Sequence, residues 1–302
     1  MKMTSERIFL WAGLAMGLGM LLSVRLPASP APSAADPAHA MAAAHQGDRP
    51  VATPAATTPP AQPVTAAPVV YGQAGGSPLH GFLARPQDVR NLAKGPLPGI
   101  IVIPEWGGLT DNIRDVTRRL AGEGYAALAV DLYGGATAAT PDEAMKLMQA
   151  SMKDMAAGQA NLRQAFDYLT SHEHAPRVGV IGWCFGGGWS LQTALLLPDK
   201  IAATVIYYGH LTADKGELAT LRMPILGFFG ADDQSIPVAS VREFESALKS
   251  LGKPVEIHVY EGAGHAFANP SGTGYRPQAA SDAWTRTVAF LARALKSGPS
   301  RA

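Results

Sequence analysis

The stretch "VGVIGWCFGGGWS", residues 178–190, decides the fold of this chain. A run of β-formers leads directly into a cluster of glycines, and the residues that follow favour a helix. The chain's only cysteine, Cys184, stands at the junction, with Gly182 two residues before it and Gly186 two residues after it. The pattern predicts a nucleophile elbow, a strained strand-to-helix turn that presents one side chain and tolerates only small residues beside it.

The position of Cys184 favours a reactive thiol. A residue at the start of a helix faces unpaired backbone N–H groups, which stabilise a thiolate and a developing oxyanion. The ordinary alternative is a small buried hydrophobe, which is the usual state of a free cysteine. The glycine spacing and the strand-to-helix context favour the nucleophile, provided that partner residues exist elsewhere in the chain.

Outward from the elbow, strand-like and helix-like segments alternate from Val69 to about Lys296. This alternation predicts an α/β fold with a mostly parallel central sheet flanked by helices. A pair of strands joined at Gly75–Gly76 is expected before it, and the stretch 141–172 is expected to form one long helical segment. In such a sheet, chemistry collects in the loops beyond the carboxyl ends of the strands.

Two such loops supply the expected partners of the thiol. Asp232 and Asp233 follow the strand-like "ILGFFG", and His265 lies in a glycine-rich loop after the last strand. We select Asp233 as the acid that orients the imidazole and expect the other aspartate to cap the next helix. The order nucleophile, acid, histidine is that of the α/β-hydrolase fold and predicts a Cys184–His265–Asp233 triad.

The N-terminal segment has the pattern of a targeting sequence. Lys2 and Arg7 precede an uncharged apolar stretch, residues 8–24, so residues 1–25 predict either a cleaved signal peptide or an uncleaved membrane anchor. A buried helix of a cytosolic domain is the alternative, which the linker-like sequence after it disfavours. We expect an exported protein, periplasmic or anchored in the inner membrane, with its catalytic domain outside the cytoplasm.

Residues 26–68 are rich in alanine, proline and threonine and predict a disordered linker. The two histidines in it, His39 and His45, are given no function. The folded domain is expected over residues 69–297.

Composition argues against several classes of function. Hydrophobic residues make up 47% of the chain and the formal net charge is +1, so a large core is possible and no broad electrostatic field arises. No basic stripe or zinc-like Cys/His spacing supports nucleic-acid binding. The glycines after Cys184 lack both the P-loop lysine and the order of a dinucleotide motif. No metal ion or organic cofactor is expected.

Taken together, "IPEWGGLTDNIRDVTRRLAGEGYAALAVDLYGG", "VIGWCFGGG", "YYG", "GADDQSIP" and "YEGAGHAFAN" resemble the dienelactone hydrolase family over about residues 70–295. The resemblance implies an α/β-hydrolase fold with cysteine as the nucleophile. It also implies that His265 is the general base and that Asp233, four residues before Pro237, orients it.

The same resemblance assigns a role to Glu105 in "IPEWGG". In the family this glutamate hydrogen-bonds the resting thiol and helps to activate it, which would keep Cys184 protonated and less open to oxidation. A solvated loop charge is the alternative for Glu105. The oxyanion hole would consist of the backbone N–H groups of Trp106 and Phe185.

The chain also departs from the family. Two arginines that hold the substrate carboxylate in the founding enzyme are replaced by Gly135 and Asn269, and neither Arg114 nor Arg276 can be assigned to the pocket. A substrate carboxylate would therefore lack a charged partner. Dienelactone itself is accordingly not the expected substrate.

The predicted activity is hydrolysis of a small carboxylic ester or lactone, in the carboxylic ester hydrolase class (EC 3.1.1). Tyr133, Trp183 and Tyr208, with Trp106 and Phe185, are expected to border an apolar pocket. A thioesterase or an acyltransferase would use the same triad. A membrane-tethered binding protein with a decayed site, or a redox protein using the lone thiol, remains the alternative from another class; oligomeric state and physiological substrate stay open.

Overall fold

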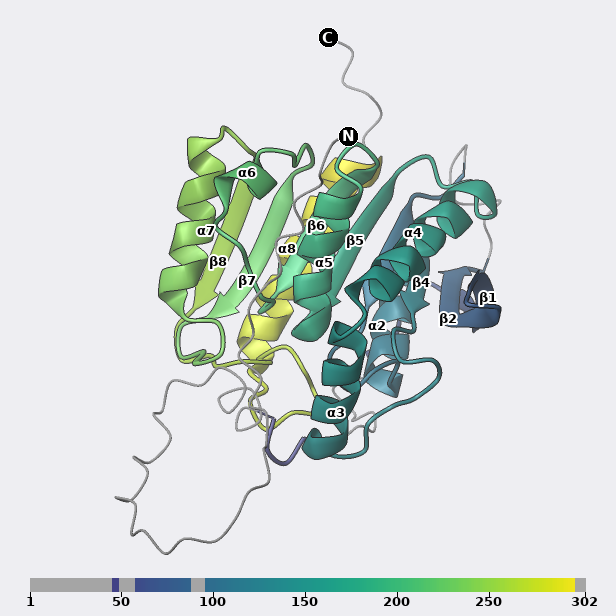
Figure 1. Ribbon diagram of the computed structural model, residues 1–302, viewed down its shortest axis with the longest axis horizontal. Coiled ribbons are helices and arrows are strands. Elements are labelled where there is room, and N and C mark those ends of the chain that lie inside the picture. Colours follow the sequence, from purple (N-terminus) through teal and green to yellow (C-terminus); the bar gives the residue numbers. More distant parts are fainter. Residues whose placement is uncertain (1–44, 49–57, 88–95, 297–302) are drawn as a thin grey trace, which may run out of the picture. The chain divides into compact units, whose positions relative to one another are not determined.

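The computed structural model describes residues 45–48, 58–87 and 96–296. An eight-stranded sheet forms its centre, with the strand order β1-β2-β4-β3-β5-β6-β7-β8 (Figure 1). Strands β3 to β8 run parallel, and β1 and β2 pair antiparallel with each other and with β4. The strands are β1 (Val64–Ala74), β2 (Ser77–Pro86), β3 (Gly99–Ile103), β4 (Ala126–Val130), β5 (Val178–Trp183), β6 (Ile201–Tyr207), β7 (Ile225–Gly230) and β8 (Val255–Tyr260).

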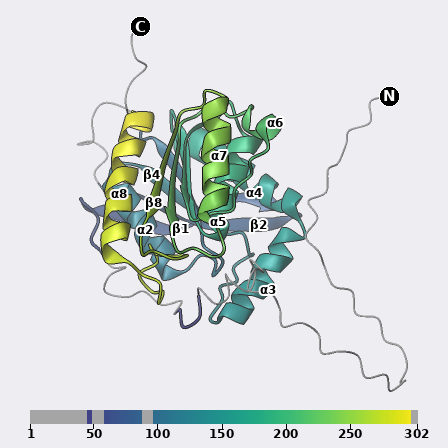
Figure 2. The same cartoon turned by 90° about the vertical axis from the view of Figure 1, so that its left-hand side faces the viewer.

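Helices cover both faces of the sheet. The helices are α2 (Asp111–Gly122), α3 (Pro141–Met152), α4 (Met155–Ser171), α5 (Phe185–Leu196), α6 (Lys215–Leu218), α7 (Val238–Ser250) and α8 (Pro277–Leu291), with a π-helical turn η1 (Ala292–Lys296). One apolar cluster joins α4, α5 and α7 to the sheet, and another joins α2 and α8 to it. Figure 2 shows α8 and α7 on opposite sides of the strands.

The central strands are apolar along their whole length because both of their faces are covered. Every residue of β3, β4, β5 and β7 is buried, which is the pattern of parallel strands between two helical layers. The expected α/β-hydrolase architecture with a mostly parallel central sheet is thus confirmed.

The segment 141–172 differs from its prediction, because it forms two helices rather than one. Helix α3 ends at Met152, and Asp154 caps the start of α4 by accepting a hydrogen bond from the backbone N–H of Ala157 at 2.9 Å. An aspartate side chain that binds the backbone in this way favours a helix start over a helix interior.

Strand β1 begins at Val64, inside the segment 26–68 that the sequence assigned to a linker. Pro68 lies within it and pairs with Phe82. A proline is tolerated there because β1 is the edge strand of the sheet and one side of its backbone needs no ladder partner. The proline-rich composition of residues 26–68 therefore gave no indication that a strand begins there.

Residues 1–25, the predicted signal peptide or anchor, lie outside the described residues, and that assignment stays a prediction. Among the helices that the structure does describe, none is both long and apolar enough to cross a membrane.

Candidate active site

The backbone around Cys184 has the geometry of an elbow. Cys184 lies between β5 and α5 with φ of 54° and ψ of −117°, a strained conformation for a residue with a side chain. A Cβ at Gly182 would overlap the carbonyl of Gly186, and a Cβ at Gly186 would overlap the carbonyls of Ile103 and Pro104. Both positions require glycine because backbone atoms, which cannot move aside, occupy the space.

This close packing sets the first turn of α5 against the loop that follows β3. Phe185 is the first residue of α5, where backbone N–H groups have no acceptor one turn earlier in the helix. Trp106 lies in the facing loop, two residues after Pro104, and is buried. The two residues expected to form an oxyanion hole thus come from segments that pack against each other.

His265 and Asp233 form a buried pair. The Nδ1 atom of His265 lies 2.8 Å from Oδ2 of Asp233, and the other carboxylate oxygen accepts backbone N–H groups of Ser235 and Ile236 at 2.8 and 2.9 Å. The neighbouring Asp232 is exposed and does not cap α7 as expected, because the N-cap position is Pro237 and no side chain caps that helix. The carboxylate has only acceptor atoms, so Nδ1 carries a hydrogen and Nε2 is left to exchange a proton.

The thiol, His265 and a third residue, His45, meet in one cluster. One ligand atom from each of these side chains lies within 4.8 Å of the others, and all three residues are buried. The Nε2 atom of His265 is buried without a hydrogen-bond partner among the described residues. The sulfur of Cys184 and Nε2 of His45 are 3.8 Å apart, a long hydrogen bond.

His45 was given no function from the sequence, because it lies in a segment whose composition predicts disorder. In the structure it is fully buried beside the thiol, and Asp48 accepts a hydrogen bond from its Nδ1 at 2.7 Å. The spacing His-x-x-Asp was the one available signal, and it is too common to single out a site. Two imidazole nitrogens and a thiol sulfur are also ligand atoms that can bind a Zn²⁺ ion.

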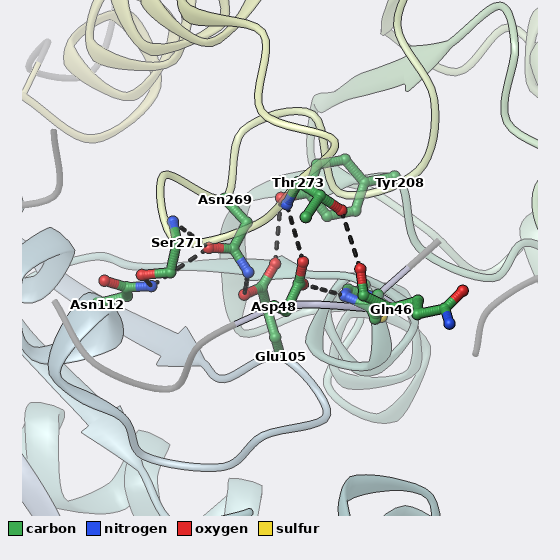
Figure 3. Close-up of polar contacts among 10 residues, drawn as sticks. Gln46, Asp48, Glu105, Asn112, Tyr208, Asn269, Ser271 and Thr273 are labelled. Atoms are coloured by element: carbon green, nitrogen blue, oxygen red, sulfur yellow. Dashed lines mark hydrogen bonds and ion pairs between the residues drawn. The ribbon is translucent and has the colours of Figure 1, made fainter. Parts of the chain in front are cut away.

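Glu105 lies near this cluster, but its carboxylate is bound elsewhere. Its two oxygens accept hydrogen bonds from the hydroxyl of Tyr208 at 3.2 Å and from the amide of Asn269 at 3.0 Å (Figure 3). Burial raises the pKa of Glu105, and the nearby His45 opposes that effect. The resemblance implied a hydrogen bond between Glu105 and the resting thiol; among the described contacts the thiol pairs instead with Nε2 of His45.

The residues expected to border one pocket lie in two separate parts of the structure. Trp183 and Tyr208 line a small cavity on the α2 side, together with Asn112 and Arg119. Tyr133 instead stacks on Phe185 with ring centroids 5.9 Å apart. Its hydroxyl is buried without a partner in the described part of the chain.

A cleft next to the cluster is lined by Glu105, Trp106 and Asn269, by the turn that contains His45 and Asp48, and by residues between 138 and 144. Neither lysine nor arginine occurs among the described residues that line it. Besides His45, which is paired with Asp48, the described lining therefore offers two carboxylates and neither lysine nor arginine to a substrate.

Gly135 and Asn269, which replace the family's two arginines, form hydrogen bonds within the protein. The backbone N–H of Gly135 binds the carboxylate of Asp131, with φ of 94°. Asn269 holds Glu105 and accepts a hydrogen bond from Asn112 at 3.2 Å. Of the two arginines weighed as substitutes, Arg114 pairs with Asp111 at 2.9 Å, and the guanidinium of Arg276 donates to the backbone carbonyls of Gly262 and Tyr275.

We compared the sequence and the structure of this chain with those of known proteins, and similar proteins were found by both comparisons. A sequence model described as the dienelactone hydrolase family matches residues 79–295. Protein usf of Aquifex pyrophilus is 34% identical over 223 residues, which is 72% of this chain and 94% of that protein. A putative carboxymethylenebutenolidase of Escherichia coli K12 is 33% identical over 242 residues, 72% of this chain and 83% of that protein.

Among solved structures, a putative dienelactone hydrolase from Klebsiella pneumoniae superposes with a TM-score of 0.68 at 31% identity. The match covers 77% of this chain and 100% of that one.

Proposed function

Because this chain belongs to the dienelactone hydrolase family and is a hydrolase of that type, we propose that it cleaves a small carboxylic ester or lactone through an acyl-cysteine intermediate. The observation that carries the proposal is the strained backbone of Cys184 beside the buried His265–Asp233 pair. Such strain persists only where the surrounding structure enforces it, and it is concentrated at functional sites.

The thiolate of Cys184 attacks the carbonyl carbon, and a C–S bond forms while the carbonyl oxygen takes up negative charge. Backbone N–H groups of Trp106 and Phe185 stabilise that oxyanion. When the tetrahedral intermediate collapses, the C–O bond of the ester breaks, the leaving oxygen takes up a proton and departs as the alcohol, and a thioester is left. Water then attacks the thioester and gives a proton to Nε2 of His265. The C–S bond of the resulting tetrahedral intermediate breaks, which releases the acid and restores the thiolate.

Trapping the intermediate tests the proposal. We expect the full chain, mixed with p-nitrophenyl acetate and quenched in acid, to gain the mass of one acetyl group on the peptide that contains Cys184. A burst of p-nitrophenol equal to the enzyme concentration would accompany it if deacylation is the slower step. A folded protein that neither turns over this ester or simple lactones nor becomes acylated would favour the binding-protein alternative.

The charge of the cleft predicts which substrates are accepted. Asp48 and Glu105 line it, no lysine or arginine does among the described residues, and its one cationic group, His45, is already paired with Asp48. A neutral ester should therefore be hydrolysed with a kcat/KM at least about tenfold higher than a matched ester that carries a carboxylate. The comparison uses phenyl acetate and the phenyl hemiester of succinic acid.

Ionic strength provides the control for this comparison. Added salt screens exposed charges, so the difference between the two esters should narrow in about 1 M salt. Faster turnover of the anionic ester at low salt would contradict this prediction and would mean that a cationic group, either His45 or one outside the described residues, binds the substrate carboxylate.

A further inference from the structure

The segment His45–Asp48 forms a tight turn that is bound to the loop after β8. The backbone N–H of Asp48 donates to the carbonyl of His45 at 3.1 Å. Gly47, the third residue of the turn, has φ of 87°, the left-handed conformation that a type II turn requires at that position. The geometry of the turn is thus built into the sequence His-Gln-Gly-Asp.

Thr273 holds this turn at two points (Figure 3). Its backbone N–H donates to Oδ1 of Asp48 at 3.0 Å, and its hydroxyl donates to the carbonyl of Gln46 at 3.2 Å. A Cβ at Gly272 would lie 3.0 Å from Oδ1 of Asp48, so the glycine makes room for the carboxylate. The turn is therefore seated by specific contacts with the loop that also carries His265.

The turn places the imidazole of His45 against the reacting groups. The ring is fully buried, 4.6 Å from the ring of Trp106 and 5.4 Å from that of His265, centroid to centroid. Asp48 holds Nδ1 at 2.7 Å, and Nε2 faces the sulfur of Cys184 at 3.8 Å.

His45 and Asp48 thus repeat the arrangement of His265 and Asp233. In both pairs a carboxylate binds Nδ1 within 2.8 Å and fixes the ring with Nε2 available for proton transfer. The thiol lies beside two histidines, each oriented by its own aspartate.

Of the two histidines, His45 is the one among the described residues that line the cleft. His45 lines the cleft, whereas Cys184 and His265 are not among the described residues that line it. His45 is therefore the member of the cluster that an ester bound in the cleft would contact.

The raised pKa of His45 suits a residue that donates a proton near neutral pH. Burial alone would lower its pKa, but the hydrogen bonds to Asp48 and Cys184 outweigh burial and raise the pKa to about 9. The charged groups that face the ring are Asp48, Cys184 and His265, with Glu105 close by. His45 is consequently protonated at neutral pH, and its proton is lost as the pH rises through about 9.

From this geometry we infer that His45, positioned by Asp48, is a second catalytic histidine that protonates the departing alcohol, while His265 serves the hydrolytic water. The inference rests on the proposed acyl-cysteine mechanism and divides its two proton transfers between two residues. It assigns a chemical step to a segment that precedes the sheet in the chain.

The proton balance closes over one turnover. In the proposed cycle the reacting pair is the Cys184 thiolate and the His45 imidazolium. When the C–S bond forms and the C–O bond breaks, the alkoxide takes the proton from Nε2 of His45 and leaves as alcohol. Water then gives one proton to His265 as it forms the acid, and that proton returns to His45 while the acid releases its own to solvent.

Leaving-group dependence tests the inference in the full chain, dialysed against a chelator. A p-nitrophenolate departs without a proton, whereas an ethoxide needs one. We expect His45→Ala and His45→Gln to lower kcat/KM about 10²-fold or more on an ethyl ester. The loss on the p-nitrophenyl ester should be at least about tenfold smaller. His172→Ala, which removes a histidine with a 71% exposed side chain, is the matched control and should leave both rates unchanged.

A second measurement does not depend on turnover. Because the chain has one cysteine, iodoacetamide reports on Cys184 alone. Loss of the imidazolium in His45→Gln should move the pH profile of alkylation upward by about one unit or more, and Asp48→Asn should move it in the same direction by less. The fall in ethyl-ester turnover as His45 loses its proton near pH 9 should also disappear in His45→Gln.

Three results would overturn the inference. Faster turnover and alkylation in His45→Ala would make the turn a cover over the thiol. Equal losses on both esters with an unchanged alkylation profile would make His45 structural. A zinc ion bound one to one, lost in His45→Ala and required for activity, would make the cluster a metal centre. Retained activity in Cys184→Ala would refute the proposed acyl-cysteine mechanism itself, which separates the two failures.

Discussion

Replacing Cys184 by alanine should lower kcat/KM for p-nitrophenyl acetate by about 10⁴-fold or more. The substitution removes the atom that forms the covalent intermediate, and the chain has no second cysteine to take its place. What remains is the oxyanion hole and substrate binding, which by themselves give a small fraction of the catalysis. The steady-state rate and the acid-quenched mass of the protein are the two measurements.

Cys184→Ser tests whether a hydroxyl can replace the thiol as the nucleophile. Serine preserves the size of the side chain, but a hydroxyl loses its proton far less readily than a thiol and needs a base during attack. We expect turnover between that of the wild type and the alanine variant, with an acetyl ester on the serine. Full activity in Cys184→Ala, with both proteins folded, would contradict a covalent role for this residue.

Gly186→Ala should unfold or severely destabilise the domain. A Cβ there would overlap the carbonyls of Ile103 and Pro104, so either the first turn of α5 or the loop after β3 has to move. Overpacking against backbone in a close-packed interior costs about 3 kcal/mol or more. We expect a fall of that size in the free energy of unfolding in urea, together with loss of ester hydrolysis.

Gly188→Ala is the matched control two residues further along the same helix. A Cβ at Gly188 would meet its nearest neighbours, atoms of His210, at 3.5 Å, which is ordinary contact. Replacing glycine by alanine inside a helix usually stabilises it by up to about 1 kcal/mol. A stability loss at Gly188 equal to that at Gly186 would show that α5 tolerates no side chain in this region, and the steric argument for the elbow would fail.

The elbow and the sheet were predictable because they depend on short-range patterns. Glycine two residues before and after Cys184 is a requirement of the turn itself, and the alternation of apolar runs with amphipathic ones reflects burial between two helical layers. The boundary between α3 and α4 was harder to predict from the sequence. The same apolar pattern continues through the break at Asp154 that separates the two helices.

Glu105 shows a different kind of limit. The resemblance placed it near the thiol, but the partners of its carboxylate, Tyr208 and Asn269, come from loops after two other strands. Which groups bind a buried carboxylate depends on how these loops pack, and spacing along the chain carries no information about that packing.

What the sequence by itself determined is the α/β-hydrolase fold, the strained cysteine and the loop positions of Asp233 and His265. These follow from periodicity, glycine spacing and strand order, which act within a few residues or through a regular topology. Only the tertiary structure brought His45 to the thiol, through contacts of the turn with Thr273, 225 residues after Asp48. Composition describes whether a segment can fold alone, and this turn is held instead by a site built by the rest of the chain.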